Sequence, residues 1–244
     1  MNFNQIINKL QESRQVFHSE DDLKFAMAWV IKELYPSYHV RLEKPININM
    51  ITNTLTEVIA RAPIDIVVLD PIFKNAYPIE IKYKTKKAAF ESNGESFSLA
   101  NHGANDGGRY SFRKDIYRIE NVNFENYIVN QGFVFILTND KGYYENNVNV
   151  KNSLDSNFSF HHGAVLLGDY IGWNYDKLPK GKYNFGDEQH INPYLKKHWT
   201  SHKEYIYKLE LKRNYLVEWN AYSHFKLDRA KSLDFRYCLI EVGR

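Results

Sequence analysis

The chain lacks the features that mark several large classes of protein. It has a single cysteine, Cys238, in 244 residues, which excludes an intrachain disulfide and a cysteine-based structural zinc site. No apolar run approaches the roughly 20 residues of a membrane-spanning helix. The first residues also lack the charged and then apolar pattern of a secretory signal. We therefore expect a cytoplasmic protein with no membrane partner.

Two common catalytic motifs are also missing. The chain has neither a GxSxG nucleophile motif nor a GxxxxGK[ST] phosphate-binding loop. Its 32 Lys and Arg residues against 29 Asp and Glu residues give a net charge of +3, which allows a nucleic-acid partner without requiring one. Aromatic residues are abundant, at 15%. A large packed core is the simpler explanation for them, and a surface that stacks on bases is the alternative.

The overall composition is that of an ordinary globular protein. Hydrophobic residues make up 43% of the chain and charged residues 25%, close to the averages for globular proteins. These values exclude a disordered chain, a collagen-like repeat and a coiled coil. The length fits one domain, or one core with an appendage.

The start of the chain predicts two helices. Ser19 is a good N-cap, and Glu20 opens an acidic first turn, where the helix dipole favours negative charge. Apolar residues then recur at helical spacing until Pro36 marks the end of the helix. Residues 3–15 predict an earlier helix with an apolar face of its own.

Extended segments follow these helices. Residues 85–110 are polar and predict a long loop, and residues 111–122 predict an amphipathic helix. The predicted strands are Tyr38–Ile48, Glu57–Leu69, Ala76–Lys84 and Gly132–Asn139. This order predicts an α/β fold with a mixed central sheet flanked by helices.

We place this α/β core in residues 1–142. Residues 143–244 predict a β-rich C-terminal extension that belongs to the same domain. Its predicted strands are Ala164–Gly168, Tyr205–Leu211, Tyr215–His224 and Phe235–Val242.

The hairpin of the second and third strands carries the most informative residues. If the chain turns at 70–75, Asp65 lies opposite Glu80 in the neighbouring strand. Since alternate residues of a strand share a face, Asp65, Glu80 and Lys82 emerge together. We expect the other face to carry five aliphatic residues, Ile64, Ile66, Val68, Ile79 and Ile81.

Carboxylates that face each other repel, so each favours a neutralising partner. Mg²⁺ suits them because it takes oxygen ligands and keeps water and phosphate oxygens in its shell, and Mn²⁺ is a possible substitute. The carbonyl oxygen of Ile81 lies within reach of the same ion. Lys82 is then placed to orient or deprotonate an attacking water, or to stabilise charge that develops on phosphorus.

Two short segments, Pro63-Ile64-Asp65 and Glu80-Ile81-Lys82, together resemble the signature of the PD-(D/E)XK nuclease superfamily. One departure is the isoleucine that separates the proline from the aspartate. The resemblance extends over Ser19–Asn139, about half of the chain, where the order of elements matches the superfamily core.

This resemblance implies a restriction-endonuclease-like fold and a metal-dependent phosphodiesterase. It implies that Asp65 and Glu80 bind the metal and that Lys82 acts at the water. Glu20 matches the acidic residue that many members carry on their first helix.

Basic residues near the motif are candidates for contact with a phosphate backbone. The six candidates are Arg61, Lys84, Lys86, Lys87, Arg109 and Arg113. Each has an ordinary alternative. Arg61 can be an ion-pair partner of the carboxylates, and the lysines can be a solvated strand end. The arginines after position 108 can pair with acids of their own helix, such as Asp115 and Glu120.

The preferred hypothesis is an endonuclease that uses Mg²⁺ to hydrolyse DNA, with double-stranded DNA as partner and restriction or defence as its role. Cutting both strands would need two sites, which the superfamily commonly supplies as a homodimer. One alternative is a non-catalytic module that binds nucleic acid or protein on a nuclease-like scaffold. Another is a nuclease that acts on RNA or branched DNA.

Overall fold

The structure, a computed structural model, describes residues 1–146, 153–170, 172–174, 199–227 and 231–243. Its larger elements are α1 (Phe3–Ser13), α2 (Glu20–Leu34), β1 (His39–Thr52), β2 (Glu57–Asp70), β3 (Asn75–Lys84), β4 (Ala88–Ser92), β5 (Glu95–Leu99), α3 (Asn105–Asn121), β6 (Gln131–Thr138), α4 (Lys141–Tyr144), β10 (Trp219–Leu227) and β11 (Lys231–Gly243). The shorter strands are β7 (Val165–Leu166), β8 (Tyr207–Lys208) and β9 (Tyr215–Leu216), and the 3₁₀ turns are η2 (Ser156–Phe158) and η5 (Trp199–Ser201). No helix in the described ranges is long and apolar enough to cross a membrane.

Both predicted N-terminal helices are present, and their caps explain where they begin. The side chain of Ser19 accepts a hydrogen bond from the backbone N–H of Asp22, as an N-cap should. Asn2 caps α1 in the same way. α2 ends at Leu34, just before Pro36.

A seven-stranded mixed sheet forms the centre of the molecule, in the order β10-β11-β6-β3-β2-β1-β8. β1, β2 and β3 form an antiparallel meander, and β6 then runs parallel to β3. A parallel neighbour requires a crossover connection, which α3 supplies. The mixed α/β architecture predicted from the sequence is therefore confirmed.

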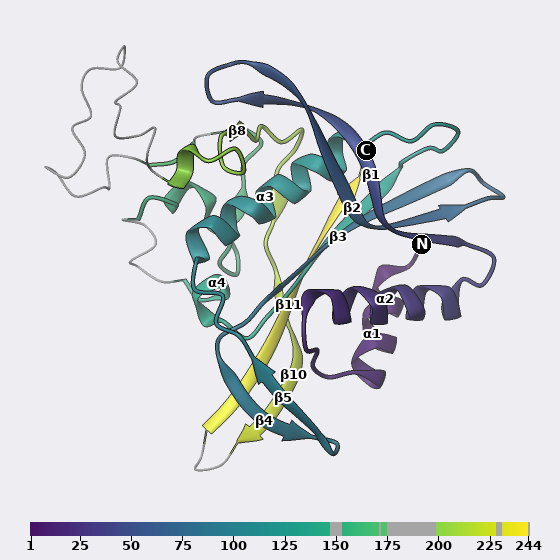
Figure 1. The fold of residues 1–244 in the computed structure, drawn as a ribbon, viewed down its shortest axis with the longest axis vertical. Helices are drawn as coiled ribbons and strands as arrows, with labels where there is room; N and C mark the ends of the chain where they lie inside the picture. The colour runs from purple at the N-terminus through teal and green to yellow at the C-terminus, as the bar shows by residue number, and fades with distance from the viewer. Residues whose placement is uncertain (147–152, 171, 175–198, 228–230, 244) are drawn as a thin grey trace, which may run out of the picture.

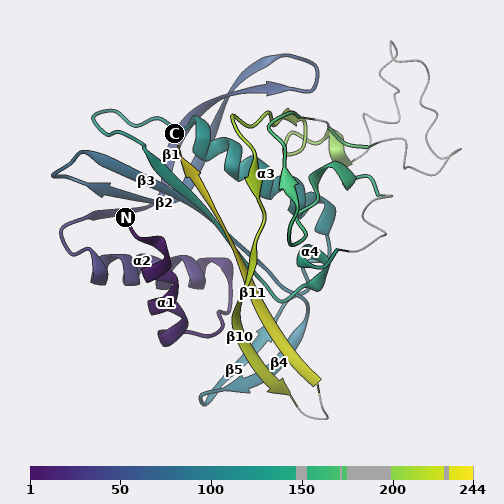
Figure 2. The ribbon, with the colours of Figure 1, turned by 180° about the vertical axis from the view of Figure 1, so that it is seen from behind.

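Helices cover the two faces of this sheet, and each face has its own core. α1 and α2 pack against one face, where Ile66, Ile79 and Ile81 are buried. α3 packs against the other face, over residues such as Val134 and Ile136. Figures 1 and 2 show these two groups of helices on opposite sides of the central strands.

The C-terminal part of the chain joins the same sheet. β11 pairs along its length with β6, and β10 pairs with β11 at the edge. Strands form in all four predicted segments, although each differs in extent from the prediction, the last being longer as β11. Only Val165–Leu166 and Tyr207–Lys208 are strands in the first two, and the third divides into β9 and β10.

Two predictions for the first half were wrong. Residues 85–110 are not one loop, because they contain the β4–β5 hairpin and the first turns of α3. Ile64 does not share a face with Ile66, since Ile64 packs in the core below α3 while Ile66 packs below α1 and α2. The regular alternation of β2 is therefore interrupted next to Asp65, where β2 leaves β3.

Candidate active site

The candidate site lies at a fork between two strands. β2 and β3 pair in the predicted register from Asp70–Asn75 as far as Ile66–Ile79, and beyond that pair the strands separate. The side chain of Asp65 lies in the gap, where its Oδ2 accepts a hydrogen bond of 2.8 Å from the N–H of Ile81. A carboxylate thus replaces the backbone partner that β3 loses.

Glu20 does the same one step further along β3. Its Oε2 accepts a hydrogen bond of 2.8 Å from the N–H of Tyr83, which brings the first residue of α2 to the strand. Between these two amides, the carbonyl oxygen of Ile81 accepts a hydrogen bond of 3.0 Å from the ammonium group of Lys82. We call this place, where Asp65 and Glu20 line the freed edge of β3, the fork.

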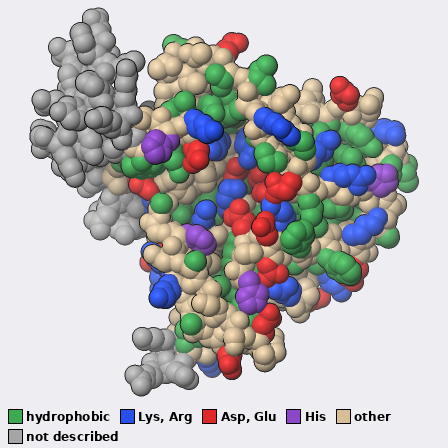
Figure 3. Space-filling model, viewed as in Figure 1, with side chains coloured by type: hydrophobic (Ala, Val, Ile, Leu, Met, Phe, Trp, Pro, Cys, Tyr) green, Lys and Arg blue, Asp and Glu red, His purple; other side chains and the backbone are tan. Residues whose placement is uncertain are grey.

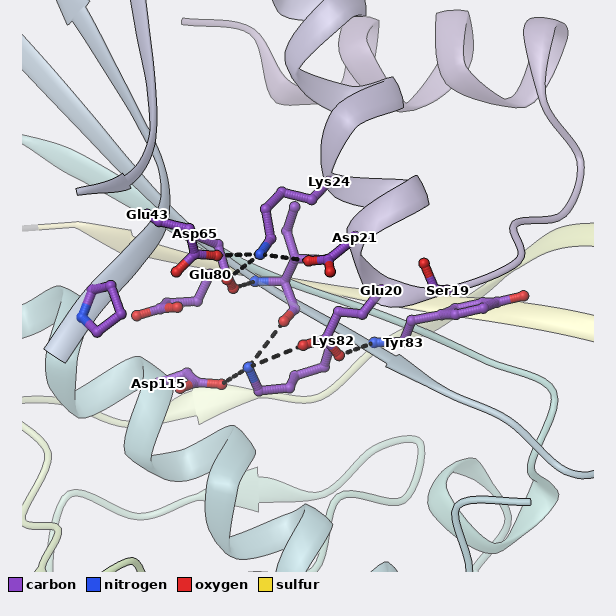
Figure 4. A network of polar contacts seen from close by, with 12 residues as sticks. Ser19, Glu20, Asp21, Lys24, Glu43, Asp65, Glu80, Lys82, Tyr83 and Asp115 are labelled. Carbon is purple, nitrogen blue, oxygen red and sulfur yellow. Dashed lines mark hydrogen bonds and ion pairs between the residues drawn. The ribbon is translucent and has the colours of Figure 1, made fainter. Parts of the chain in front are cut away.

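The side of the fork that faces α3 holds a second layer of charge. Glu80 and Lys82 point from β3 toward α3, where they contact Asp115 and Arg118. Figure 4 shows Glu80, Lys82 and Asp115. The Nζ of Lys82 lies 3.2 Å from Oδ2 of Asp115 and 3.9 Å from Oε1 of Glu20. Arg118 lies 3.0 Å from Oε1 of Glu80 and 3.4 Å from Oδ1 of Asp115.

The side that faces α2 is held by one lysine. The ammonium group of Lys24 lies 3.2 Å from Oδ1 of Asp65 and 3.1 Å from Asp21, and it also pairs with Glu43 (Figure 4). Lys24 is only 6% exposed. The fork cluster is therefore a set of five ionisable side chains, Asp65, Glu80, Lys82, Asp115 and Arg118, with Lys24 and Glu20 at its border. In Figure 3 acidic and basic side chains lie intermixed on this face.

The two predicted metal ligands hold their charges differently. Burial is the main reason that the pKa of Glu80 is well above its usual value, and the nearby carboxylate of Asp115 raises it further. Burial also acts to raise the pKa of Asp65, but the ammonium of Lys82 and the N–H of Ile81 outweigh it, and the pKa falls. The raised pKa favours the protonated form of Glu80 beside an Asp65 whose lowered pKa favours the ionised form.

Lys82 remains a cation in this environment. Burial alone would lower its pKa, but the carboxylates of Asp115, Glu20 and Glu80 raise it above the ordinary value for lysine. A protonated lysine cannot accept a proton from water. Of the roles open at the start, orienting the water and stabilising negative charge therefore fit Lys82 better than acting as a base.

A divalent cation fits the oxygens of the fork in part. Oε1 of Glu80 and Oδ2 of Asp115 are buried without a hydrogen-bond donor, although each lies near a cation. A metal ion binds oxygens of this kind, and it takes the place of a proton that two acids share. Among the described residues, however, no group of three or more His, Cys, Asp or Glu side chains is arranged to hold a metal. An ion at the fork would therefore need the Ile81 carbonyl and water to complete its ligands.

Four of the predicted nucleic-acid contacts lie at the surface. Lys86 and Lys87 are exposed at the end of β3, and Lys86 pairs with Asp140 at 3.3 Å. Lys84 is partly exposed and lines a cavity together with Lys82. Arg61 is exposed on β2 and lines a second cavity beside Arg118.

The other two predicted contacts lie inside the protein. Arg109 is 6% exposed, pairs with Asp155 and donates to a carbonyl oxygen. Arg113 is 3% exposed and donates to the carbonyl oxygens of four residues, Leu167, Gly168, Asp169 and Leu209. Their burial does not fit contact with a phosphate backbone, and neither pairs with an acid of its own helix.

Sequence reasoning missed three members of the site. The candidate residues predicted from the sequence include neither Lys24 nor Arg118, and Asp115 was predicted only as an ion-pair partner within its helix. Asp115 does pair within α3, with Arg118 at 3.4 Å. The spacing of Asp115 and Arg118 could have revealed them. They are three residues apart, so they lie on the same face of the helix, and this is the face that covers β3.

Comparisons with known proteins identify no relative. No family model, no curated protein and no solved structure matches the chain.

Proposed function

We propose that this protein is a metal-dependent endonuclease that hydrolyses phosphodiester bonds of DNA, built on a restriction-endonuclease-like core. The observation that carries the proposal is the meeting of Asp65, Glu80, Lys82 and the Ile81 carbonyl at one fork of the sheet. The fork is not sealed, because Lys82 lines a cavity of about 390 Å³ that opens to solvent.

The proposed metal is Mg²⁺, with Mn²⁺ as a substitute. Asp65, Glu80 and the carbonyl oxygen of Ile81 are the groups that would hold it. When bound, such an ion lowers the pKa of a water and neutralises charge on the phosphate. The proton of Glu80 would have to leave first, which links metal binding to pH.

The chain's own residues supply the rest of the chemistry. Lys82, held as a cation between Asp115 and Glu20, is placed to orient a water and to stabilise the negative charge that grows on the phosphate oxygens. Glu20 and Asp115 position Lys82. Asp65 is fixed by the N–H of Ile81, so its carboxylate needs little reorganisation.

The test is cleavage of plasmid DNA by the purified protein in Mg²⁺ or in EDTA, beside the Lys82→Met and Lys226→Met variants. Lys226 is an exposed lysine on β10 and serves as the matched control. We expect cleavage only with metal, a loss of about 10²-fold or more in Lys82→Met, and none in the control. Equal cleavage by Lys82→Met would show that the fork is not the catalytic centre.

A second candidate function is a non-catalytic module that binds DNA or protein on the same scaffold. The observation that favours it is that Lys24 and Arg118 already neutralise the acids of the fork. In that case the two cations take the place of the metal. Isothermal titration with Mg²⁺ separates the two functions, since the binding module would show no heat of binding that depends on Asp65.

A further inference from the structure

Two cavities lie next to the fork cluster, one on each side of α3's contact with β3. The first, which we call the helix-start cavity, has a volume of about 390 Å³ and lies between the end of β3 and the start of α3. The second, the arm cavity, has a volume of about 330 Å³ and lies between β1, β2, the middle of α3 and residues 203–207. Apart from Lys82, which lines the helix-start cavity, none of their lining residues belongs to the catalytic set proposed above.

The arm cavity is strongly basic. The charged side chains that line it are Arg61, Lys114, Arg118, Lys203 and Glu204, four cations and one anion. Burial lowers the pKa of Lys114, whose ammonium donates to the carbonyl oxygen of Glu204. The Nε of Arg118 is buried and has no hydrogen-bond acceptor. An anion in this cavity would meet an excess of positive charge.

The helix-start cavity offers donors of two kinds. Lys84 lines it, as do Lys82 and the buried glycines of α3's first turn. α3 has Ala104 at its N-cap and no capping side chain, and the N–H of Gly107 in its first turn donates to the carboxylate of Asp106. Tyr143, only 1% exposed, lines the same cavity, and its hydroxyl has no hydrogen-bond partner among the described residues.

His102 adds a donor whose tautomer the structure determines. Its Nδ1 accepts a hydrogen bond of 3.0 Å from the N–H of Thr85, so the proton of the neutral ring lies on Nε2. Burial and the neighbouring Lys84 lower the pKa of His102, which keeps the ring neutral at pH 7. Nε2–H is therefore a hydrogen-bond donor at the cavity rather than a base.

The fork cluster joins the two cavities. Lys82 lines the helix-start cavity and pairs with Asp115, which pairs with Arg118, which lines the arm cavity. A polynucleotide whose scissile phosphate lies at Lys82 therefore has a basic cavity on either side of it.

We propose that the helix-start cavity and the arm cavity are phosphate subsites that hold one DNA strand on both sides of the bond to be cut. The proposal rests on the proposed function for the position of the cut, but binding at the two cavities stands without it. It assigns Arg61 and Lys203 to one flanking phosphate, and Lys84 and His102 to the other. A strand needs phosphates on both sides to occupy both subsites, so the site selects internal bonds.

Binding in EDTA tests this without cleavage. The measurement is fluorescence anisotropy of a labelled DNA oligonucleotide, single-stranded and duplex, over a series of salt concentrations. The variants are Arg61→Gln with Lys203→Gln, and Lys84→Gln with His102→Gln. Lys226→Gln with Lys9→Gln is the control, since Lys226 is exposed, Lys9 is partly exposed and pairs with Glu33, and neither lines the two cavities.

We expect each subsite variant to weaken binding by about tenfold. The slope of log Kd against log salt should fall by about one for each phosphate that the variant no longer neutralises. The control pair should bind as the unmodified protein does. Subsite variants that bind like the control would overturn the proposal, even if the protein cleaves DNA. The expected weakening in a protein that cleaves nothing would uphold the subsites and refute the nuclease.

Discussion

α3 lies between two buried sets of charged residues that differ in one respect. The fork cluster contains oxygens without donors, carboxylates that crowd one another and a glutamate with a raised pKa. On another side of the helix, Arg109, Arg113 and Glu120 form what we call the anchor cluster. Glu120 accepts from the N–H of Lys212 and from the hydroxyl of Tyr215 at 2.7 Å, and Arg113 donates to backbone carbonyl oxygens.

Charged groups that hold the fold together can be distinguished by this difference from charged groups that serve a function. Buried polar groups are normally satisfied, and the anchor cluster follows that rule, tying α3 to the C-terminal half of the chain. The fork cluster breaks the rule at the place where the strands part. Unsatisfied buried groups that lower stability are typical of functional sites, where a ligand supplies the missing contacts. For the fork cluster we propose that this ligand is a metal ion.

The largest effect is expected when a member of the anchor cluster is removed, because this tests directly whether the cluster stabilises the fold. Arg113→Met leaves buried carbonyl oxygens without a donor, and we expect a loss of about 3–5 kcal/mol in the free energy of unfolding. Urea denaturation followed by circular dichroism measures it. Arg61→Met, an exposed arginine changed in the same way, should cost no more than about 0.5 kcal/mol. Similar losses for the two variants would remove the distinction between buried and exposed arginine.

A pair of identical substitutions compares the two clusters directly. Glu120→Gln turns one acceptor into a donor that faces the N–H of Lys212, and we expect it to lower stability by about 2 kcal/mol. Glu80→Gln resembles the protonated form that the fork already favours, so its stability should match or exceed that of the unmodified protein. Glu80→Gln should nevertheless abolish metal-dependent cleavage, which Glu120→Gln retains below its lowered melting temperature. A Glu80→Gln protein as unstable as Glu120→Gln would contradict our account.

The pH dependence of stability sharpens the comparison with a smaller effect. Because the folded pKa of Glu80 is above its unfolded value, the folded protein holds an extra proton between those two pKa values. Stability contributed by this group is therefore lost as pH rises through that window. We expect the melting temperature of the unmodified protein to fall by a few degrees relative to Glu80→Gln as the pH rises from the ordinary pKa of glutamate through the raised pKa of Glu80.

Adding Mg²⁺ should reduce that difference at the upper end of the pH range, because the ion replaces the proton. Asp65 affects stability in the opposite way, because its pKa is lowered by folding: the stability that it contributes is lost as the pH falls below the ordinary pKa of aspartate. The effects of Asp65 and Glu80 therefore occur in different pH ranges and can be told apart. Differential scanning fluorimetry in Mg²⁺ and in EDTA provides both measurements. A melting temperature difference that is independent of pH would show that Glu80 is ionised throughout.

Much of the central fold was accessible from sequence because local signals agreed with the final packing. The capping by Ser19 and the turn that follows Asp70 each act through neighbouring residues, and so the first helices and the β2–β3 register were predicted correctly. The β4–β5 hairpin was missed because its strands are short and polar and its turn, at Asn93–Gly94, lies within a longer polar stretch.

The site was accessible only in part, for a physical reason. Asp65 and Glu80 follow from strand pairing, which is a near-neighbour relation. Lys24 reaches Asp65, and Arg113 reaches the carbonyl of Leu209, through contacts that depend on how helices dock on the sheet. Nothing in the spacing of those residues distinguishes a buried arginine from one that contacts a ligand, and so Arg109 and Arg113 were assigned to the wrong surroundings.

The hydrogen bonds that β3 makes at the fork bear on how an ion can enter. Asp65 and Glu20 each accept a hydrogen bond from an amide of β3 in addition to their ion pairs with Lys24 and Lys82, so the backbone also holds both acids in place. A metal ion at the proposed site would take the place of a proton and of the contacts that Lys24 and Arg118 make with the acids, while the backbone hydrogen bonds to Asp65 and Glu20 are already formed without it.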